Sequence, residues 1–281
     1  MNTIKYRILN VFAETPFGGN PLAVIEDGSG LTDQEMQLIA RQFNLSETTF
    51  ILPSEQAAAR IRIFTPSYEM PFAGHPTLGS AQVIRAMMNA GDDFKIEMEA
   101  GLIAVTAQEN RWSLTANSPT YRPMTATRAE LAAMLNLPES ALADNPMWVN
   151  CGTEQSMIML NNVEYVHACK PNAKLLAQYC RNLAGQAKAY IFAQVPGGFE
   201  VRYFWMVDDF SISEDPGTGS ACANLGGWWL STQGDKPLNA KVSQGTVMGR
   251  PNLLTLQVSD GQIQVGGRVI EMGSGELHWA R

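Results

Sequence analysis

The stretch GHPTLGSAQ (Gly74–Gln82) decides the fold, because a similar stretch, PGTGSACAN (Pro216–Asn224), recurs in the other half of the chain. Each opens on glycine and proline and runs into a segment that a later glycine ends, which is the punctuation of a helix. The first helix continues as LGSAQVIRAMM and is apolar nearly all round, as expected for a helix enclosed by its own sheet. The sequence therefore predicts two enclosed helices, one in each half.

Strand-like segments surround both helices in the same order. The order in each half is strand, strand, helix, strand, strand, glycine turn, helix and further strands. In the first half, Thr32 and Glu35 form a capping-box pattern, which predicts an early helix over 33–43. In the second half the corresponding helix is predicted over 171–185, ending at a glycine.

This repetition indicates two halves of one ancestral unit. Strands and helices do not alternate strictly, which disfavours a doubly wound parallel sheet. We predict an α+β fold of two pseudo-symmetric domains, each a curved, mostly antiparallel sheet wrapped around a central helix. The expected domains are 1–118 and 119–267, with the linker at 117–123, where SPTYRP breaks the pattern.

Composition restricts the class of protein. The 281 residues are 45% hydrophobic and 17% charged, with a net charge of −7 and no basic stripe, which disfavours nucleic-acid binding. No apolar run reaches the roughly 18 residues of a membrane span, and the first residues lack an apolar signal core. The four cysteines form no C-x-x-C pair, so we expect free thiols in a cytoplasmic protein.

The two glycine-marked helix starts are candidate binding elements. A helix N-terminus presents unpaired N–H groups and a partial positive charge, and glycine lets a ligand approach the backbone. Two such ends facing each other across a cleft would bind a carboxylate and stabilise developing negative charge. The alternative is that both are ordinary helix starts.

Three ionisable side chains near these turns are candidate catalytic groups. Glu47 precedes the uncharged strand TTFIL, where partial desolvation would raise its pKa and make it a base. His75 is a proton donor, a substrate orienter or a core histidine, and Asp215 is a helix cap, a substrate ligand or a turn residue. Glu47 has its own alternative as a solvent-facing strand-end residue.

Other catalytic signatures are absent from the sequence. There is no G-x-G-x-x-G, Walker loop, H-E-x-x-H or G-x-S-x-G pattern, and the three histidines are widely separated. We therefore predict neither a metal nor a cofactor. Cys222 lies two residues beyond Ser220, about 200° around a helix, so it should point away from a site that Ser220 faces. This disfavours a racemase that uses two thiols.

Four motifs together resemble the PhzF-like family of phenazine-biosynthesis proteins, within the wider diaminopimelate epimerase-like superfamily. They are GNPLAVI, SETTF, RIFTPSYEMPFAGHPTLGSA and EDPGTGSA, in this order along the chain. Gly217 departs from the pattern, since alanine is frequent there in the family.

The resemblance implies a cofactor-free isomerase that moves a proton on a small cyclic or conjugated carboxylate. It implies Glu47 as the catalytic base, with Gly74, His75, Asp215 and Ser220 shaping the site. It also implies a homodimer and a last strand, 268–281, that returns to the first domain. From the neighbouring loops we add further predicted substrate-binding residues: Asn20, Ser46, Thr218 and Gly219.

Three alternatives stay open at this point. One is an epimerase or racemase of amino acids or hydroxy acids that uses Glu47 with Asp215 or His75. Another is a non-catalytic small-molecule-binding protein on the same fold. The third is a cysteine hydrolase.

Overall fold

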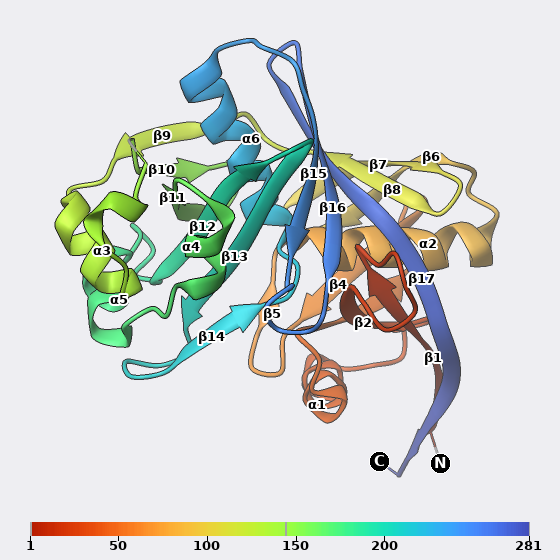
Figure 1. Cartoon of the computed structure of the whole chain (residues 1–281). Helices are drawn as coiled ribbons and strands as arrows, with labels where there is room; N and C mark the ends of the chain where they lie inside the picture. Colours follow the sequence, from red (N-terminus) through yellow and green to blue (C-terminus); the bar gives the residue numbers. More distant parts are fainter. Residues whose placement is uncertain (1, 144, 281) are drawn as a thin grey trace. The chain divides into compact units, whose positions relative to one another are not determined.

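The computed structural model describes residues 2–143 and 145–280 (Figure 1). The chain divides into two compact units, Met1–Thr115 with Gly266–Arg281 and Ala116–Val265. Each unit combines a mostly antiparallel set of strands with helices, so the predicted α+β class is confirmed.

The first unit places one helix in each of two parallel crossovers. Strand pairs β2–β3 and β4–β6 are parallel, and the pairs β1–β2, β3–β4, β4–β5, β6–β7 and β7–β8 are antiparallel. Helix α1 connects the first parallel pair and α2 the second. The elements in chain order are β1 (Asn2–Val11), β2 (Asn20–Ile25), α1 (Asp33–Phe43), β3 (Glu47–Leu52), β4 (Ala59–Phe64), β5 (Glu69–Met70), α2 (Gly74–Met88), β6 (Asp93–Met98), β7 (Gly101–Gln108) and β8 (Arg111–Thr115).

Helix α1 begins as the sequence predicts. The Thr32 hydroxyl accepts the N–H of Glu35, and the Glu35 side chain accepts the N–H of Thr32, which completes the capping box. The apolar face of the helix, which includes Met36, packs against Phe50 and Phe64 of the strands. Helix α1 therefore covers one face of this sheet.

Helix α2 packs on β1, β2 and β3, and most of its residues from His75 to Ile84 are buried. Gly79 is required by this packing, because a Cβ there would lie 2.5 Å from Cδ2 of Leu22. The strands between α1 and α2 are buried on both faces, which explains why LAVI and TFI read as continuous apolar runs rather than alternating ones.

The second unit also contains two parallel strand pairs, and it has more helices. Pairs β11–β12 and β13–β15 are parallel, and β9–β10, β10–β11, β12–β13, β13–β14 and β15–β16 are antiparallel. Helices α4 and α5 connect the first parallel pair, and α6 connects the second. The elements are β9 (Thr120–Pro123), α3 (Arg128–Leu135), a 3-10 turn (Glu139–Ala141), β10 (Met147–Asn150), β11 (Glu154–Met159), α4 (Val163–Ala168), α5 (Ala173–Tyr179), β12 (Lys188–Val195), β13 (Gly198–Met206), β14 (Ile212–Asp215), α6 (Gly219–Gln233), β15 (Leu238–Gln244) and β16 (Asn252–Ser259).

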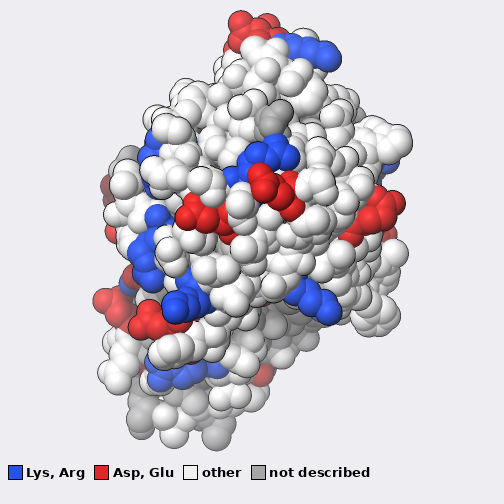
Figure 2. Space-filling view, turned by 60° about the vertical axis from the view of Figure 1, so that its left-hand side comes forward, with Lys and Arg blue, Asp and Glu red and all other residues white. Residues whose placement is uncertain are grey.

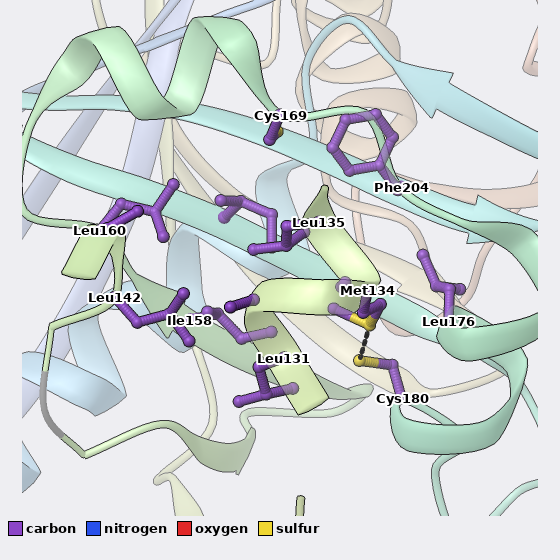
Figure 3. Packing of buried hydrophobic residues seen from close by; sticks show 14 of the residues in the cluster. Leu131, Met134, Leu135, Leu142, Ile158, Leu160, Cys169, Leu176, Cys180 and Phe204 are labelled. Carbon is purple, nitrogen blue, oxygen red and sulfur yellow. Dashed lines mark hydrogen bonds between the residues drawn. The ribbon is translucent and has the colours of Figure 1, made fainter. Parts of the chain in front are cut away.

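Strand β12 separates two apolar layers of this unit. On one face, side chains such as Ile191 join a core formed with α3, α4 and α5, whose members include Leu135 and Leu176 (Figure 3). On the other face Phe192 packs edge-on against Trp228 of α6, with ring centroids 5.0 Å apart. Helix α6 is therefore held against the sheet by large buried side chains.

Two sequence expectations differ from the structure. Residues 120–123, predicted as linker, form β9, because their backbone pairs with β10. The helix predicted to reach Gly185 ends at Tyr179, and Cys180 to Gly185 form turns in which the Asn182 side chain accepts the N–H groups of Ala184 and Gln186. A short helix at 163–168, capped by Asn162, was not predicted.

The final strand, β17 (Gln262–Trp279), begins in the second unit and continues into the first. It pairs antiparallel with β1 from Val269 opposite Val11 to Trp279 opposite Asn2. A register shift at Ile8–Leu9 marks a bulge in this pairing. The predicted boundaries at 118 and 267 remain predictions.

Acidic and basic side chains lie interspersed on the face drawn in Figure 2. Within the described residues, none of the helices has the length and apolar character needed to span a membrane.

Candidate active site

Glu47 stands at the first position of β3, where it pairs with Leu22 on one side of a well-buried strand. Its side chain is 15% exposed, and the next four residues are buried. The apolar run that follows anchors the strand in the core and leaves the carboxyl group at the strand end. A carboxylate in such a place has little bulk water around it.

His75 approaches this carboxyl group from the first turn of α2. Its Nε2 lies 3.3 Å from Oε2 of Glu47, and its Nδ1 lies 3.4 Å from Nδ2 of Asn20. Asn20 begins β2 and is fully buried. Three residues predicted from separate motifs are therefore together in the first unit.

The His75 ring is neutral. Burial lowers its pKa to about 3, and a hydrogen bond with the backbone of Pro21 opposes this shift only in part. The contact with Glu47 is therefore between an imidazole and a carboxyl group and is not an ion pair. A neutral imidazole has one donor and one acceptor nitrogen, so it is suited to orienting a partner or relaying a proton.

Helices α2 and α6 share an unusual start. Their N-cap residues, Ala73 and Thr218, make no side-chain cap hydrogen bond to the first turn. By contrast, side chains cap α1, α3, α4 and α5. The first-turn N–H groups of α2 and α6 lack side-chain caps, as at anion-binding helix ends.

Thr218 holds Asp215 instead of capping α6. The Thr218 hydroxyl donates to the Asp215 carboxylate, and Gln244, which is fully buried, connects both ends of this turn. The Gln244 amide donates to the Asp215 carbonyl at 2.7 Å and to the Thr218 hydroxyl at 2.9 Å. Its Oε1 accepts the Thr218 N–H at 3.1 Å. The turn from Asp215 to Thr218 is therefore fixed by hydrogen bonds within the second unit.

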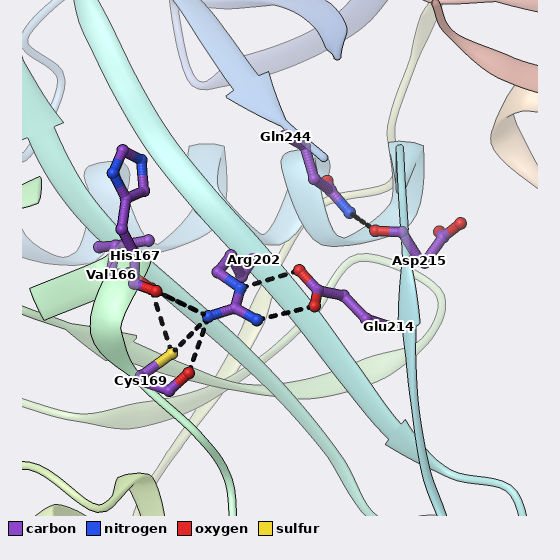
Figure 4. A network of polar contacts seen from close by, with 7 residues as sticks. All are labelled: Val166, His167, Cys169, Arg202, Glu214, Asp215 and Gln244. Atoms are coloured by element: carbon purple, nitrogen blue, oxygen red, sulfur yellow. Dashed lines mark hydrogen bonds and ion pairs between the residues drawn. The ribbon is translucent and has the colours of Figure 1, made fainter. Parts of the chain in front are cut away.

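Strand β14, which carries Asp215, is held by an ion pair between a buried arginine and a partly buried glutamate. The Arg202 guanidinium forms two hydrogen bonds of 2.8 Å with Glu214 (Figure 4). It also donates to the carbonyl of Cys169, at the end of α4, at 2.8 Å. Successive strand residues point to opposite faces, so this pair holds Glu214 on one face and leaves Asp215 on the other.

The other predicted residues have different surroundings. Gly74 and Gly219 are the first residues of α2 and α6. Ser220 is half-buried and accepts a hydrogen bond from Gln155. Ser46 is exposed immediately before β3, and its part in binding remains a prediction.

The departure at Gly217 has a local physical reason. A Cβ at this position would lie 2.3 Å from Oδ1 of Asn252, whose side chain is buried. Asn252 thus occupies the space that a methyl group would need.

The surroundings of Cys222 do not suit thiol chemistry. Cys222 is fully buried, and burial raises the pKa of its thiol well above the usual range. Among residues 2–143 and 145–280, no group of three or more His, Cys, Asp and Glu side chains is arranged to hold a metal ion.

Sequence reasoning missed Gln155, Gln244 and Arg202. The available signal was a polar residue at a core-facing position of an apolar strand, as in the alternation Ala240, Val242, Gln244 along β15. A buried polar side chain must find hydrogen-bond partners, but the sequence does not say which ones.

Known proteins resemble this chain along nearly its whole length. The model of the PhzC-PhzF family, described as phenazine biosynthesis-like protein, matches residues 9–274. An uncharacterized isomerase of Pasteurella multocida is 42% identical over 277 residues, covering 97% of this chain and 93% of the relative. The trans-2,3-dihydro-3-hydroxyanthranilate isomerase of Pseudomonas fluorescens is 31% identical over 287 residues, covering 97% of this chain and 99% of that enzyme.

A solved structure shows the same fold. The crystal structure of a Bacillus anthracis phenazine biosynthesis protein of the PhzF family matches with a TM-score of 0.89 and 25% identity. The match covers 99% of this chain and 100% of that one.

Proposed function

Because the chain belongs to the phenazine biosynthesis-like protein family, we propose that it moves a proton on a small cyclic or conjugated carboxylate, without a cofactor and with Glu47 as the base. The isomerase class follows from the relatives, which are named isomerases. The observation that supports the residue assignment most is the pairing of a shielded Glu47 carboxyl group with the neutral imidazole of His75 at 3.3 Å.

The proposed reaction needs only one carboxyl group to carry the proton. Glu47 takes a proton from a ring carbon, and the electron pair of the C–H bond enters the conjugated system. Protonated Glu47 then delivers the proton to another carbon, and the double bond shifts. Such a base works only on a substrate acidified by conjugation, because a carboxylate is a weak base for carbon acids.

The remaining groups would bind and orient the substrate. The uncapped N–H groups at the starts of α2 and α6 are suited to a carboxylate and to charge that develops during proton transfer. His75 would orient the substrate in the first unit, and Asp215 would accept a hydrogen bond from a substrate amine or hydroxyl.

We also propose that the two units are equivalent halves with pseudo-symmetric folds. The support is the repeated order of pairings, in which β1 to β7 correspond to β10 to β16. Helices α2 and α6 also correspond, and each has 15 residues and an N-cap without a side-chain bond.

The function is tested with Glu47→Gln and trans-2,3-dihydro-3-hydroxyanthranilate in deuterated water. We expect the wild type to shift the double bond, and deuterium to enter at the receiving carbon to the extent that protonated Glu47 exchanges with solvent before it delivers the proton. The variant should keep its affinity for substrate and lose turnover by about 10²–10⁴-fold, which is the usual contribution of general acid–base catalysis. Glu55→Gln, at an exposed glutamate, is the matched control and should leave turnover unchanged.

Wild-type-like turnover by Glu47→Gln would overturn the role of this residue. Label at a stereocentre with racemisation, using amino or hydroxy acids, would establish an epimerase instead. Tight substrate binding with neither double-bond migration nor exchange at any carbon would point to a binding protein.

A further inference from the structure

A series of hydrogen bonds through two buried side-chain amides connects Cys151 to Ser220 in the first turn of α6. It starts at Cys151, whose backbone N–H donates to Oδ1 of Asn224 at 2.8 Å. A backbone N–H only donates, so this contact identifies the Asn224 oxygen. The Asn224 Nδ2 then donates to the carbonyl of Thr153 at 2.8 Å, and a carbonyl only accepts. Both contacts fix the same orientation of the Asn224 amide.

The orientation of the Asn224 amide determines the orientation of the Gln155 amide. The Asn224 Nδ2 also donates to Oε1 of Gln155 at 2.5 Å, so Nε2 of Gln155 points the other way. This Nε2 donates to the Ser220 hydroxyl oxygen at 3.1 Å. Asn224 and Gln155 are 0% and 1% exposed, so water does not compete for these bonds.

The direction of these bonds determines what Ser220 can do. A hydroxyl group has one hydrogen, and its oxygen here accepts from Gln155, so the hydrogen points elsewhere. By contrast, the Thr77 hydroxyl, in the fourth position of α2, donates to the carbonyl of Ala73 at 2.7 Å. Within the described residues no protein acceptor receives the Ser220 hydrogen, and Ser220 is only half-buried.

We propose that Gln155, oriented by Asn224, is a positioning residue that makes Ser220 a hydrogen-bond donor to an anionic ligand oxygen. The inference rests on the proposed function, because it deepens the recognition of a carboxylate at the start of α6. It adds that selectivity for a carboxylate over a neutral amide is determined by two buried amides that do not touch the ligand.

Gln155→Glu reverses the direction of the last bond. A carboxylate at this position still accepts from Asn224 but has no hydrogen for Ser220. The Ser220 hydroxyl then donates inward and presents its lone pair to the ligand. Gln155→Met removes the donor without reversing the bond, so its effect should be smaller.

The test measures binding of anthranilate and of anthranilamide, its neutral amide, to the full chain by calorimetry. We expect the wild type to prefer anthranilate. A hydrogen bond to a charged group corresponds to about a tenfold to hundredfold difference in affinity, so Ser220→Ala should lose most of this preference. Gln155→Glu should lose it to the same extent or invert it. Gln194→Glu, on an exposed side chain of β12, adds the same charge and should keep the preference.

A double-mutant cycle separates the action through Ser220 from a general effect of charge or structure. If Gln155 acts through the hydroxyl, Gln155→Glu should change the preference little once Ser220 is alanine. If Gln155→Glu does not fold, the same cycle is run with Gln155→Met, where the effect of Ser220→Ala should shrink.

Two results would count against the proposal in different ways. Additive effects in the cycle, or an undiminished preference in Gln155→Glu, would overturn the positioning role and leave the proposed function standing. Failure of the wild type to prefer anthranilate over anthranilamide would overturn carboxylate recognition by the proposed site, and the inference with it.

Discussion

His75 has a pKa far below that of an ordinary histidine. Burial lowers its pKa to about 3, whereas an exposed histidine titrates near 6.5. The folded protein therefore keeps this ring neutral at every pH at which the unfolded chain begins to protonate it. This difference couples the protonation of one side chain to the stability of the fold.

The coupling predicts how stability depends on pH. Above about pH 6.5 the ring is neutral in both states, and His75 contributes no pH dependence. As pH falls from about 6.5 to about 3, the unfolded state binds a proton that the folded state does not, so the free energy of unfolding falls. The slope from this residue reaches about 1.4 kcal/mol per pH unit.

Urea unfolding of the wild type and of His75→Gln, at a series of pH values from 7 to 4, measures this effect. The variant has no titrating ring, so the difference in stability between the two proteins should shift in favour of the variant by up to about 3 kcal/mol at pH 4. Parallel pH dependence in both proteins would contradict the neutral, buried state of the ring.

For individual residues, the sequence predicted the candidate catalytic side chains better than the buried residues that hold such side chains in place. The motifs containing Asn20, Glu47 and His75 are distant in sequence, and the structure brings these side chains together as a group. Gln155 and Gln244 were missed because their partners lie far away along the chain. Only the fold determines which buried donor meets which acceptor.

Among the elements, β14 is held in place by a charged side chain of the neighbouring strand β13. Its residue Glu214 forms a bidentate ion pair with Arg202, which is 8% exposed and also binds carbonyls at the end of α4. Buried charges are costly to separate, because each needs its partner to replace lost water. The strand that carries Asp215 is thus tied to the sheet and to α4 by one guanidinium.

Arg202→Met should lower the free energy of unfolding by up to about 3 kcal/mol, since it leaves the partly buried Glu214 without its partner. Amide hydrogen exchange in β14 should speed up more than exchange in β12. The double variant Arg202→Met/Glu214→Leu removes both charges and should be more stable than the single variant. A double variant no more stable than the single one would show that packing, rather than the lost charge pair, dominates.

Element boundaries that neighbouring residues determine were predicted correctly from the sequence. Boundaries that depend on distant contacts were not. The capping box at Thr32 and Glu35 lies within one turn, and α1 begins where it indicates. The end of α5 at Tyr179 and the pairing that makes 120–123 a strand depend on distant contacts. Those contacts leave no pattern in the segments themselves.

For the whole molecule, the decisive feature is that the first unit is not contiguous in sequence. It needs residues 266–281, which follow the entire second unit. Strand β1 pairs on one side with β2 and on the other with β17, so without the final strand one edge of β1 is unpaired. An unpaired edge loses its hydrogen bonds and exposes the apolar side chains that the partner covers.

Truncation after Val265 should therefore destabilise the first unit more than the second. We expect amides of β1 to lose protection from hydrogen exchange while β12 and β13 keep theirs, because all strand partners of β12 and β13 lie within the second unit. Truncation after Leu277 is the matched control. It removes the pairing opposite Asn2 and Thr3, together with the contact of Trp279 with the α1 core, and should leave protection elsewhere in β1 largely intact. If β12 and β13 lose protection together with β1, the two units unfold as one cooperative structure, and the second cannot form before the last strand is in place.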